Sequence, residues 1–247
     1  VDTAEVTTLS AFQFDTGYWN FQVASDRDAG VLYALSSAQT LYSIPMDGSA
    51  VAKVASLTEP LGVIEMSGEH ELISLFYNQA TGQTELRTAD IRTGKVSTLT
   101  TVDFDDDWHS YLVVDRDNGV LYAATIQDTL YRIALDGSDV TVVGTLSDEI
   151  QKMGLGDNGL IGIGYNSATQ HNELRRINPD TAEVTTVVSF DFDSGHWHHG
   201  MLTEPSAGVV YATSSHGTLY QLQMDGSAVE NMGQLSQPVQ VWLHGAK

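Results

Sequence analysis

The segment "GVLYALSSAQTLYSIPMDGSAV", residues 30–51, indicates the fold because the chain contains two further segments that are similar to it. Its copies are "GVLYAATIQDTLYRIALDGSDV" at 119–140 and "GVVYATSSHGTLYQLQMDGSAV" at 208–229, so successive copies begin 89 residues apart. Segments of a second kind alternate with these, since "ELISLFYNQATGQTELRTADI" from Glu71 matches "GLIGIGYNSATQHNELRRINP" from Gly159. Self-similarity at a fixed period indicates a repeat architecture.

Each 89-residue repeat divides into two sub-units of about 44 residues, and each sub-unit has the pattern of short β-strands. One sub-unit contains four strand-length runs, "HSYLVVD", "VLYAAT", "TLYRIAL" and "VTVVGTL", separated by turns such as "DRDNG" and "LDGSD". Four strands in so few residues, repeated around the chain, are typical of propeller blades. We therefore predict an all-β, six-bladed β-propeller built as three 89-residue two-blade repeats, with residues 1–247 forming a single β-propeller domain.

The two ends of the chain belong to the same predicted blade. Val1 aligns with the residue just before a fourth strand, and the last residues, "VQVWLHGAK", align with a first strand. We therefore expect the sixth blade to be incomplete and shared by the two chain ends. Strands of an open blade have unpaired edges, which predicts strand addition by a partner.

The repeat around Tyr122 resembles that of six-bladed YWTD propellers of the LDL-receptor class B type. "GVLYAATIQDTLYRIALDGSDVTVV" has an aromatic residue after a turn glycine, a second strand with Leu-Tyr, and then Leu-Asp-Gly-Ser before a β-branched run. It departs from that family because Ala-Ala-Thr follows Tyr122 where the rest of the Tyr-Trp-Thr-Asp motif would stand. The resemblance implies the fold and says little about function, because propellers include both binding modules and enzymes.

The composition narrows the classes of partner. Eleven basic residues against 32 acidic ones give a net charge of −21, which disfavours nucleic acid and anionic lipid and suits cations or cationic partners. The chain has no cysteine, so thiolate metal sites and a cysteine nucleophile are excluded. No apolar run reaches the roughly 20 residues of a membrane span, so we expect no membrane insertion. We expect an exported protein, extracellular or periplasmic.

A candidate metal site comes from "SFDFDSGHWHHG", residues 189–200, and its counterpart "FDDDWHS" from Phe104. Both segments enter the first strand of a blade, at the end of a propeller where ligands usually bind. We expect these residues to gather at the channel mouth and to bind a divalent ion such as zinc or nickel: Asp107, His109, His196 and His198. The alternative is a solvated loop whose histidines bond to carbonyl groups or water.

The same entry segments supply candidate ligand-binding residues. Tyr18 and Asn20 occupy the rim positions in the first repeat, and strand alternation places the aligned tryptophans with His199 on the opposite face. The tryptophans are Trp19, Trp108 and Trp197. They either pack between blades or form an aromatic platform on which sugar rings stack.

Acidic turns are the remaining candidates. The Asp-Gly-Ser sequences at Asp47, Asp136 and Asp225 recur in every repeat, which indicates hairpin turns rather than calcium loops. "DRD" at residues 26–28 and 115–117 is also interpreted as a turn, with calcium binding near the channel as the alternative. Glu65 aligns with Gly154 and Leu243, so the ring of acidic residues on the inner strands is poor.

These observations favour a non-enzymatic binding propeller that holds a protein, small-molecule or glycan ligand at the channel mouth or at the open blade edge. Two alternatives remain: a metal-assisted hydrolase or lactonase, and a glycan-binding lectin. No catalytic residue is assigned, since no nucleophile is paired with a base in the sequence. No cofactor is certain, and the one candidate is a divalent metal: zinc, nickel or calcium.

Overall fold

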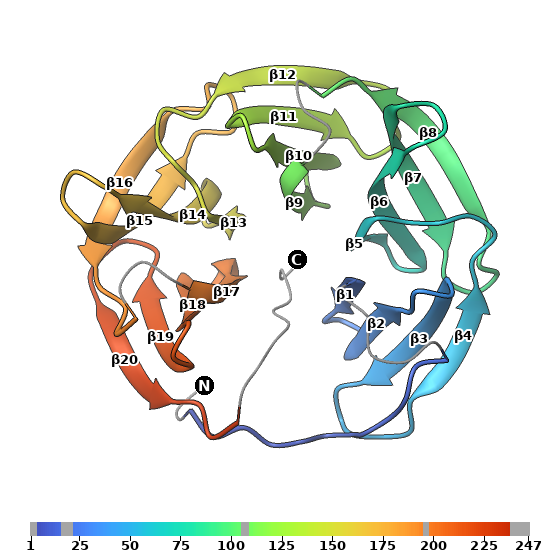
Figure 1. Ribbon diagram of the computed structural model, residues 1–247, viewed down its shortest axis with the longest axis horizontal. Coiled ribbons are helices and arrows are strands. Elements are labelled where there is room, and N and C mark those ends of the chain that lie inside the picture. Colours follow the sequence, from blue (N-terminus) through green and yellow to red (C-terminus); the bar gives the residue numbers. More distant parts are fainter. Residues whose placement is uncertain (1–3, 16–21, 105–108, 195–197, 238–247) are drawn as a thin grey trace. The chain divides into compact units, whose positions relative to one another are not determined.

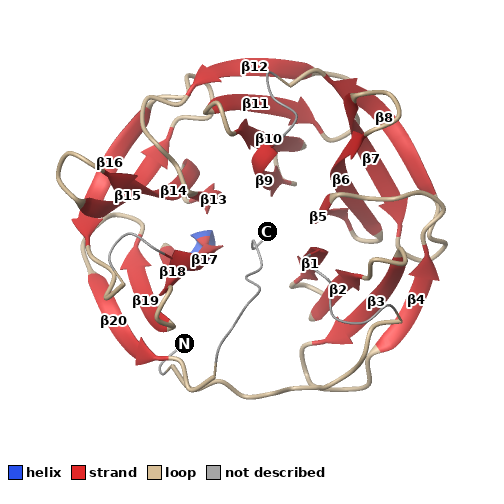
Figure 2. Cartoon of the chain, in the orientation of Figure 1, coloured by secondary structure: helices blue, strands red, loops and turns tan. Residues whose placement is uncertain are grey.

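A computed structural model of the chain describes residues 4–15, 22–104, 109–194 and 198–237. Apart from one short 3-10 turn, η1 (Pro205–Ala207), the regular structure of these residues is β-strand (Figure 1, Figure 2). Their contacts fall into two compact units. The N-terminal unit comprises residues 8–126 and 132–141, and the C-terminal unit comprises 4–7, 127–131 and 142–237.

The strands form five four-stranded antiparallel sheets, each with its strands in chain order, which is the arrangement of propeller blades. Blade 1 contains β1 (Gln22–Asp26), β2 (Val31–Leu35), β3 (Thr40–Pro45) and β4 (Ala52–Ser56). Blade 2 contains β5 (Val63–Gly68), β6 (Glu71–Asn78), β7 (Gln83–Asp90) and β8 (Val96–Val102). Blade 3 contains β9 (His109–Asp115), β10 (Val120–Thr125), β11 (Thr129–Ala134) and β12 (Val140–Thr145).

Blades 4 and 5 complete the described sheets. Blade 4 contains β13 (Lys152–Gly156), β14 (Gly159–Asn166), β15 (His171–Ile177) and β16 (Val184–Phe190). Blade 5 contains β17 (His198–Glu204), β18 (Val209–Ser214), β19 (Thr218–Gln223) and β20 (Val229–Gln234). The predicted β-propeller architecture and its repeats are confirmed, because β2, β10 and β18 lie at equivalent places in the three copies of the repeat.

The predicted sixth blade is wrong. The described chain has five four-stranded blades, and no incomplete blade is shared by its ends. Residues 4–14, expected to form a fourth strand, have no strand assignment, because a strand needs a neighbour to complete its ladder of hydrogen bonds. The segment "VQVWLHGAK", expected to supply the first strand, lies outside the described residues. The expectation of strand addition at an incomplete blade therefore loses its basis.

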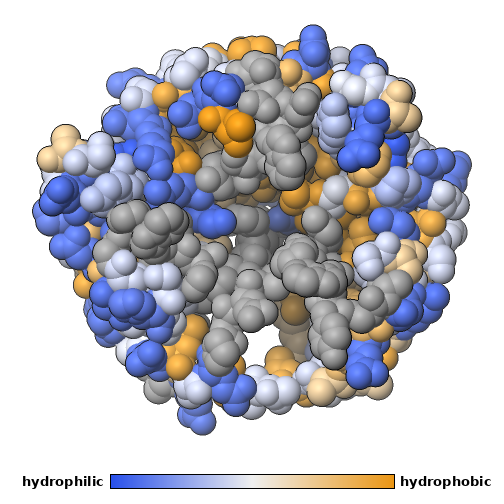
Figure 3. Space-filling model, viewed as in Figure 1, coloured by the Kyte–Doolittle hydropathy of each residue, from blue (hydrophilic) through white to orange (hydrophobic). Residues whose placement is uncertain are grey.

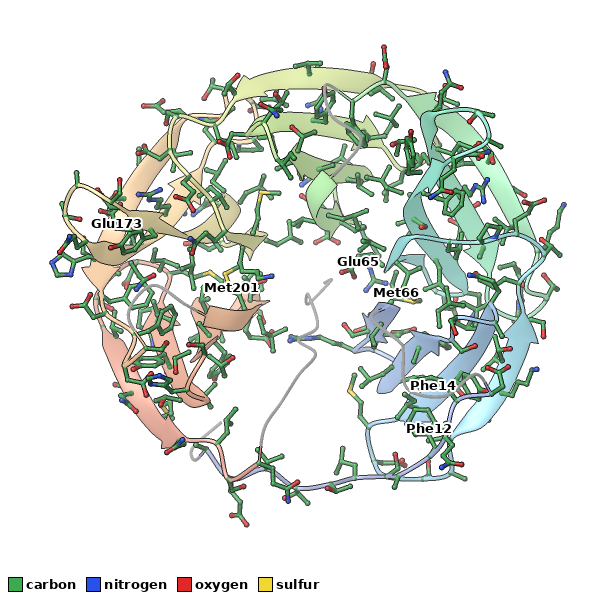
Figure 4. All side chains as sticks on the ribbon, in the orientation of Figure 1. Phe12, Phe14, Glu65, Met66, Glu173 and Met201 are labelled. Carbon is green, nitrogen blue, oxygen red and sulfur yellow. The ribbon has the colours of Figure 1, made fainter. Side chains whose placement is uncertain are left out.

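Within each unit, neighbouring blades bury a shared apolar core. In the N-terminal unit, Ile64 and Met66 of β5 pack with Leu35 and Leu41 of blade 1. In the C-terminal unit, Met201 of β17 belongs to a core cluster with Ile163 and Leu174 of blade 4 (Figure 4). The outward side chains are mixed, and many hydrophilic ones cover the face presented in Figure 3.

The two units repeat the same junction before the first strand of a blade. In the N-terminal unit, the Asp15 carboxylate accepts a hydrogen bond from Thr40 Oγ1 at 2.5 Å, and the Asp15 backbone N–H donates to Tyr42 Oη at 3.2 Å. In the C-terminal unit, Asp193, Thr218 and Tyr220 make the equivalent bonds at 2.5 and 2.9 Å. The junction holds Asp15 against β3 of blade 1, and it holds Asp193, which follows β16, against β19 of blade 5.

Candidate functional site

Most of the residues predicted to form the channel mouth cannot be placed. These residues lie outside the described part of the chain: Tyr18, Trp19, Asn20, Asp107, Trp108, His196 and Trp197. His109 begins β9 in the N-terminal unit, and His198 begins β17 in the C-terminal unit, with His199 next to it. The metal site and the aromatic platform therefore remain predictions.

The backbone changes one premise of those predictions. The pairing of β17 with β18 shifts register between His198 and Gly200, and the pairing of β9 with β10 shifts at the equivalent point, between Ala124 and Thr125. A β-bulge inserts an extra residue and interrupts the alternation of side chains between the two faces. Strict alternation along the backbone, which those predictions assumed, consequently does not extend through the start of these strands.

The described part of the N-terminal unit contains a pocket at the other end of the first strands. The first strands β1 and β5 contact each other, and β5 also contacts β9. Because the three strands lie side by side, the turns that follow them come together. Asp26, Asp28, Ala29, Glu69 and Arg116 line a pocket of about 410 Å³. We call it the turn pocket, and its size lies in the range of about 300–1,000 Å³ that is usual for ligand sites.

Local turn chemistry places the acidic residues of blade 1 at this pocket. Asp26 ends β1, is 5% exposed, and accepts the Ala29 backbone N–H through Oδ1 at 3.1 Å. Gly30 then takes φ of +64°, a conformation that favours glycine, and its N–H donates to the Arg27 carbonyl at 3.2 Å. The interpretation of "DRD" as a turn is confirmed, and the same turn holds Asp28 at the pocket wall.

The turns of the next two blades supply the other charged groups. Glu69 lies between β5 and β6, is exposed, and has His70 Nε2 at 3.7 Å from its Oε1. Arg116 follows β9, in a turn where Asp115 accepts the Asn118 backbone N–H at 3.1 Å. Three carboxylates and one guanidinium therefore line the turn pocket, so its net charge is negative when all four groups are ionised.

Glu65 is buried on β5 of blade 2 and interacts electrostatically with Arg116, in the turn after β9. Its neighbours Ile64 and Met66 point into the core shared with blade 1, so alternation turns Glu65 to the opposite face of β5, toward β9 (Figure 4). The residue is 3% exposed, and its Oε2 has no hydrogen-bond partner among the described residues. Burial raises the pKa of the Glu65 carboxyl well above its usual value of 4.5, and the Arg116 guanidinium offsets part of this increase.

The Asp-Gly-Ser sequences do not contribute to this site. Asp47, Asp136 and Asp225 each accept the backbone N–H of the serine two residues later, at 2.9 Å in every case. Hydrogen bonds from those serines lower the pKa of all three aspartates. The prediction that these sequences form hairpin turns is confirmed.

The structure assigns no metal cluster within the described residues, since no three acidic or histidine side chains there are placed to share an ion. None of the helical structure in the same residues is long and apolar enough to cross a membrane. The sequence motif "DRD" indicated part of the turn pocket, since it contains Asp26, Asp28 and, in its second copy, Arg116. Nothing in the sequence indicated Glu69, because a single acidic residue in a surface turn has no distinguishing pattern.

No family model matches the chain, and no curated protein matches it. Solved structures do. An oligogalacturonate lyase in complex with manganese superposes with a TM-score of 0.66 at 12% identity, covering 95% of this chain and 69% of that one. A nidogen/laminin complex gives 0.61 at 11% identity, covering 87% and 82%, and TolB from Acinetobacter baumannii gives 0.61 at 15%, covering 87% and 55%. At these identities the likeness shows the fold alone: the chain is a β-propeller.

Proposed function

We propose that this chain is a non-enzymatic binding propeller whose turn pocket holds a cationic group of a ligand or protein partner. The observation that carries the proposal is the lining of the pocket, where Asp26, Asp28 and Glu69 outnumber Arg116. The overall charge of −21 adds to the attraction of a cation, because the summed field of a protein steers oppositely charged partners toward it.

The geometry supports recognition rather than chemistry. The carboxylates come from turns at the ends of β1 and β5, and Asp26 is held by its bond to the Ala29 backbone N–H. Binding groups held by a scaffold in this way lose little conformational entropy when the ligand enters. The hydrolase and lectin alternatives depend chiefly on residues 18–20, 107–108 and 196–197, which the structure does not describe, and they remain predictions.

Export to the periplasm or the cell exterior is part of the same proposal. It draws on the acidic composition, which implies a surface of the kind found in secreted proteins. Fractionation of the native source with an antibody against the chain would test it. Recovery only with the cytoplasmic fraction would contradict export.

Isothermal titration calorimetry tests the binding function. We expect the protein to bind N-acetyl-lysine amide, to bind the neutral N-acetyl-norleucine amide much more weakly, and to lose affinity as salt is added. Asp28→Asn and Glu69→Gln should each weaken the cation about two- to fivefold, as expected for partly solvated charge pairs. Glu183→Gln, an exposed change in the other unit with the same effect on net charge, is the control. Equal binding of the neutral compound, or no binding of the cation, would refute the proposal.

A further inference from the structure

The dipeptide Asn-Gly occurs twice in the chain, at residues 118–119 and 158–159, and each copy lies between the first two strands of a blade. Asn118 follows β9 in the N-terminal unit, and Asn158 follows β13 in the C-terminal unit; both side chains are exposed. A glycine has no Cβ, so its backbone nitrogen is open to approach by the side chain of the asparagine before it. The two turns therefore offer the same chemistry in different surroundings.

Hydrogen bonds hold the turn around Asn118. Its side-chain Nδ2 donates to Asp115 Oδ2 at 2.7 Å, and its backbone N–H donates to Asp115 Oδ1 at 3.1 Å. The Gly119 N–H donates to the Arg116 carbonyl at 3.2 Å. The Asn118 side chain must give up its bond to Asp115 before its carbonyl carbon can meet the Gly119 nitrogen, so this copy is protected.

The turn around Asn158 restrains its side chain less. No hydrogen bond holds the Asn158 side chain among the described residues, whereas the adjacent Asp157 carboxylate accepts Arg176 Nη1 at 2.6 Å. Gly156 and Gly159 form the last pair of the β13–β14 ladder. The end of a ladder opens at a lower free energy than pairs inside a sheet. The Asn158 side chain can therefore turn toward the Gly159 nitrogen without first losing a bond of its own.

We propose that Asn158 is a site of spontaneous covalent modification, which converts it to isoaspartate and aspartate. The Gly159 backbone nitrogen attacks the side-chain carbonyl carbon of Asn158, and the new carbon–nitrogen bond closes a succinimide ring. The side-chain amino group leaves as ammonia, taking the proton of the Gly159 N–H. Water then opens the ring: attack at the backbone carbonyl gives isoaspartate, and attack at the side-chain carbonyl gives aspartate.

Both products change the turn between β13 and β14. Each adds a carboxylate next to Asp157, in a chain whose net charge is already −21. Isoaspartate also lengthens the main chain, because the backbone then runs through the side chain. The loop between Gly156 and Gly159 is too short to absorb this change, so their pairing should weaken. Arg176 links this turn to blade 5 by donating to the Met224 carbonyl at 3.2 Å, so the change affects both blades.

Peptide mapping by mass spectrometry tests the proposal on the folded protein after incubation in mildly alkaline buffer. Unmodified, aspartate and isoaspartate peptides are separated and counted at both sites. We expect Asn158 to convert about tenfold faster than Asn118, because Asn118 must first break a hydrogen bond to a charged group. Asp115→Ala removes that bond and should speed the conversion of Asn118 about tenfold. Asn158→Gln, whose longer side chain closes the ring far more slowly, should leave its turn unmodified.

Three outcomes would overturn the proposal. The first is conversion of Asn158 no faster than that of Asn118. The second is aspartate at Asn158 without isoaspartate, because direct hydrolysis of the amide passes through no ring. The third is an unchanged rate at Asn118 in Asp115→Ala, which would remove the reason for a difference between the two turns. The comparison in the parent holds even if a variant does not fold, since both sites are in one molecule.

Discussion

Arg175→Met should destabilise the protein more than any surface change, because it removes one member of a buried ion pair. The Arg175 and Glu173 side chains are 2% and 5% exposed, and their charged atoms lie 2.8–2.9 Å apart. The Arg175 guanidinium also donates to the Glu149 carbonyl, which ties blade 4 to the segment that enters it. On blade 2, Arg87 makes the same contacts with Glu85 and with the Pro60 carbonyl.

The expected loss follows from what remains after the substitution. Burial favours the neutral form of Glu173, but hydrogen bonds from Thr186, Asn166 and Arg175 keep the pKa of Glu173 below its usual value. Without Arg175 the carboxylate is left buried without a counter-charge, which typically costs about 3–5 kcal/mol in the free energy of unfolding. The Glu149 carbonyl also loses its donor. Adding Glu173→Gln to Arg175→Met should recover at least about 1 kcal/mol, because the unpaired charge is then gone.

Urea denaturation of the parent, both single variants and the double variant measures these free energies. The control is Arg92→Met, which removes an arginine that is 66% exposed and lies 3.1 Å from Asp90. Hydrogen bonds from Arg92 and Thr93 lower the pKa of Asp90 to about 2, yet solvent screens this pair, so we expect little change in stability. A loss below about 1 kcal/mol for Arg175→Met, or a double variant no more stable than Arg175→Met, would show that Glu173 does not depend on Arg175 as a buried counter-charge.

Three further predictions concern a turn, the buried acid and the histidines. Gly226→Ala should lower the free energy of unfolding more than Gly217→Ala does. Both glycines have a positive φ, but a Cβ at Gly226 would lie 3.0 Å from an atom of β16, whereas the space around Gly217 is open. Equal losses for the two variants in urea denaturation would contradict this. Burial raises the pKa of Glu65 in the folded protein, so the free energy of unfolding should fall as the pH rises above about 4.5. Glu65→Gln should therefore melt at a higher temperature than the parent at neutral pH but not in acid. A lower melting temperature of Glu65→Gln at neutral pH would contradict a raised pKa for Glu65. Calorimetry with zinc or nickel should show binding at about pH 7.5 that weakens at about pH 5.5, because the histidines are then protonated. The double variant His109→Ala/His198→Ala should not bind the metal. Unchanged affinity in that variant would contradict the predicted metal site.

The strands were predictable because their signals are local. The four runs chosen between residues 109 and 146 correspond to β9, β10, β11 and β12 within a residue or so at each end. β-Branched runs and Asp-Gly-Ser turns act over a few residues, so the sequence contains the whole signal. The number of blades depends on whether distant segments pair. Residues 4–14 align with a fourth strand, but the alignment does not show whether they have the partner strands that a ladder of hydrogen bonds requires.

The turn pocket was not predictable for the opposite reason. Its charged groups come from three blades, and Asp26, Glu69 and Arg116 are more than 40 residues apart along the chain. Only the side-by-side packing of β1, β5 and β9 brings them together. Alignment of the repeats showed Glu65 as an isolated acid, but it could not show that Glu65 would interact electrostatically with Arg116.

A crystal structure of the protein soaked with N-acetyl-lysine amide would show directly whether the turn pocket holds a cation. We expect density for the lysine side chain in the turn pocket, with its ammonium among Asp26, Asp28 and Glu69. Density at another site, or an empty turn pocket at a ligand concentration that saturates the protein in solution, would contradict it.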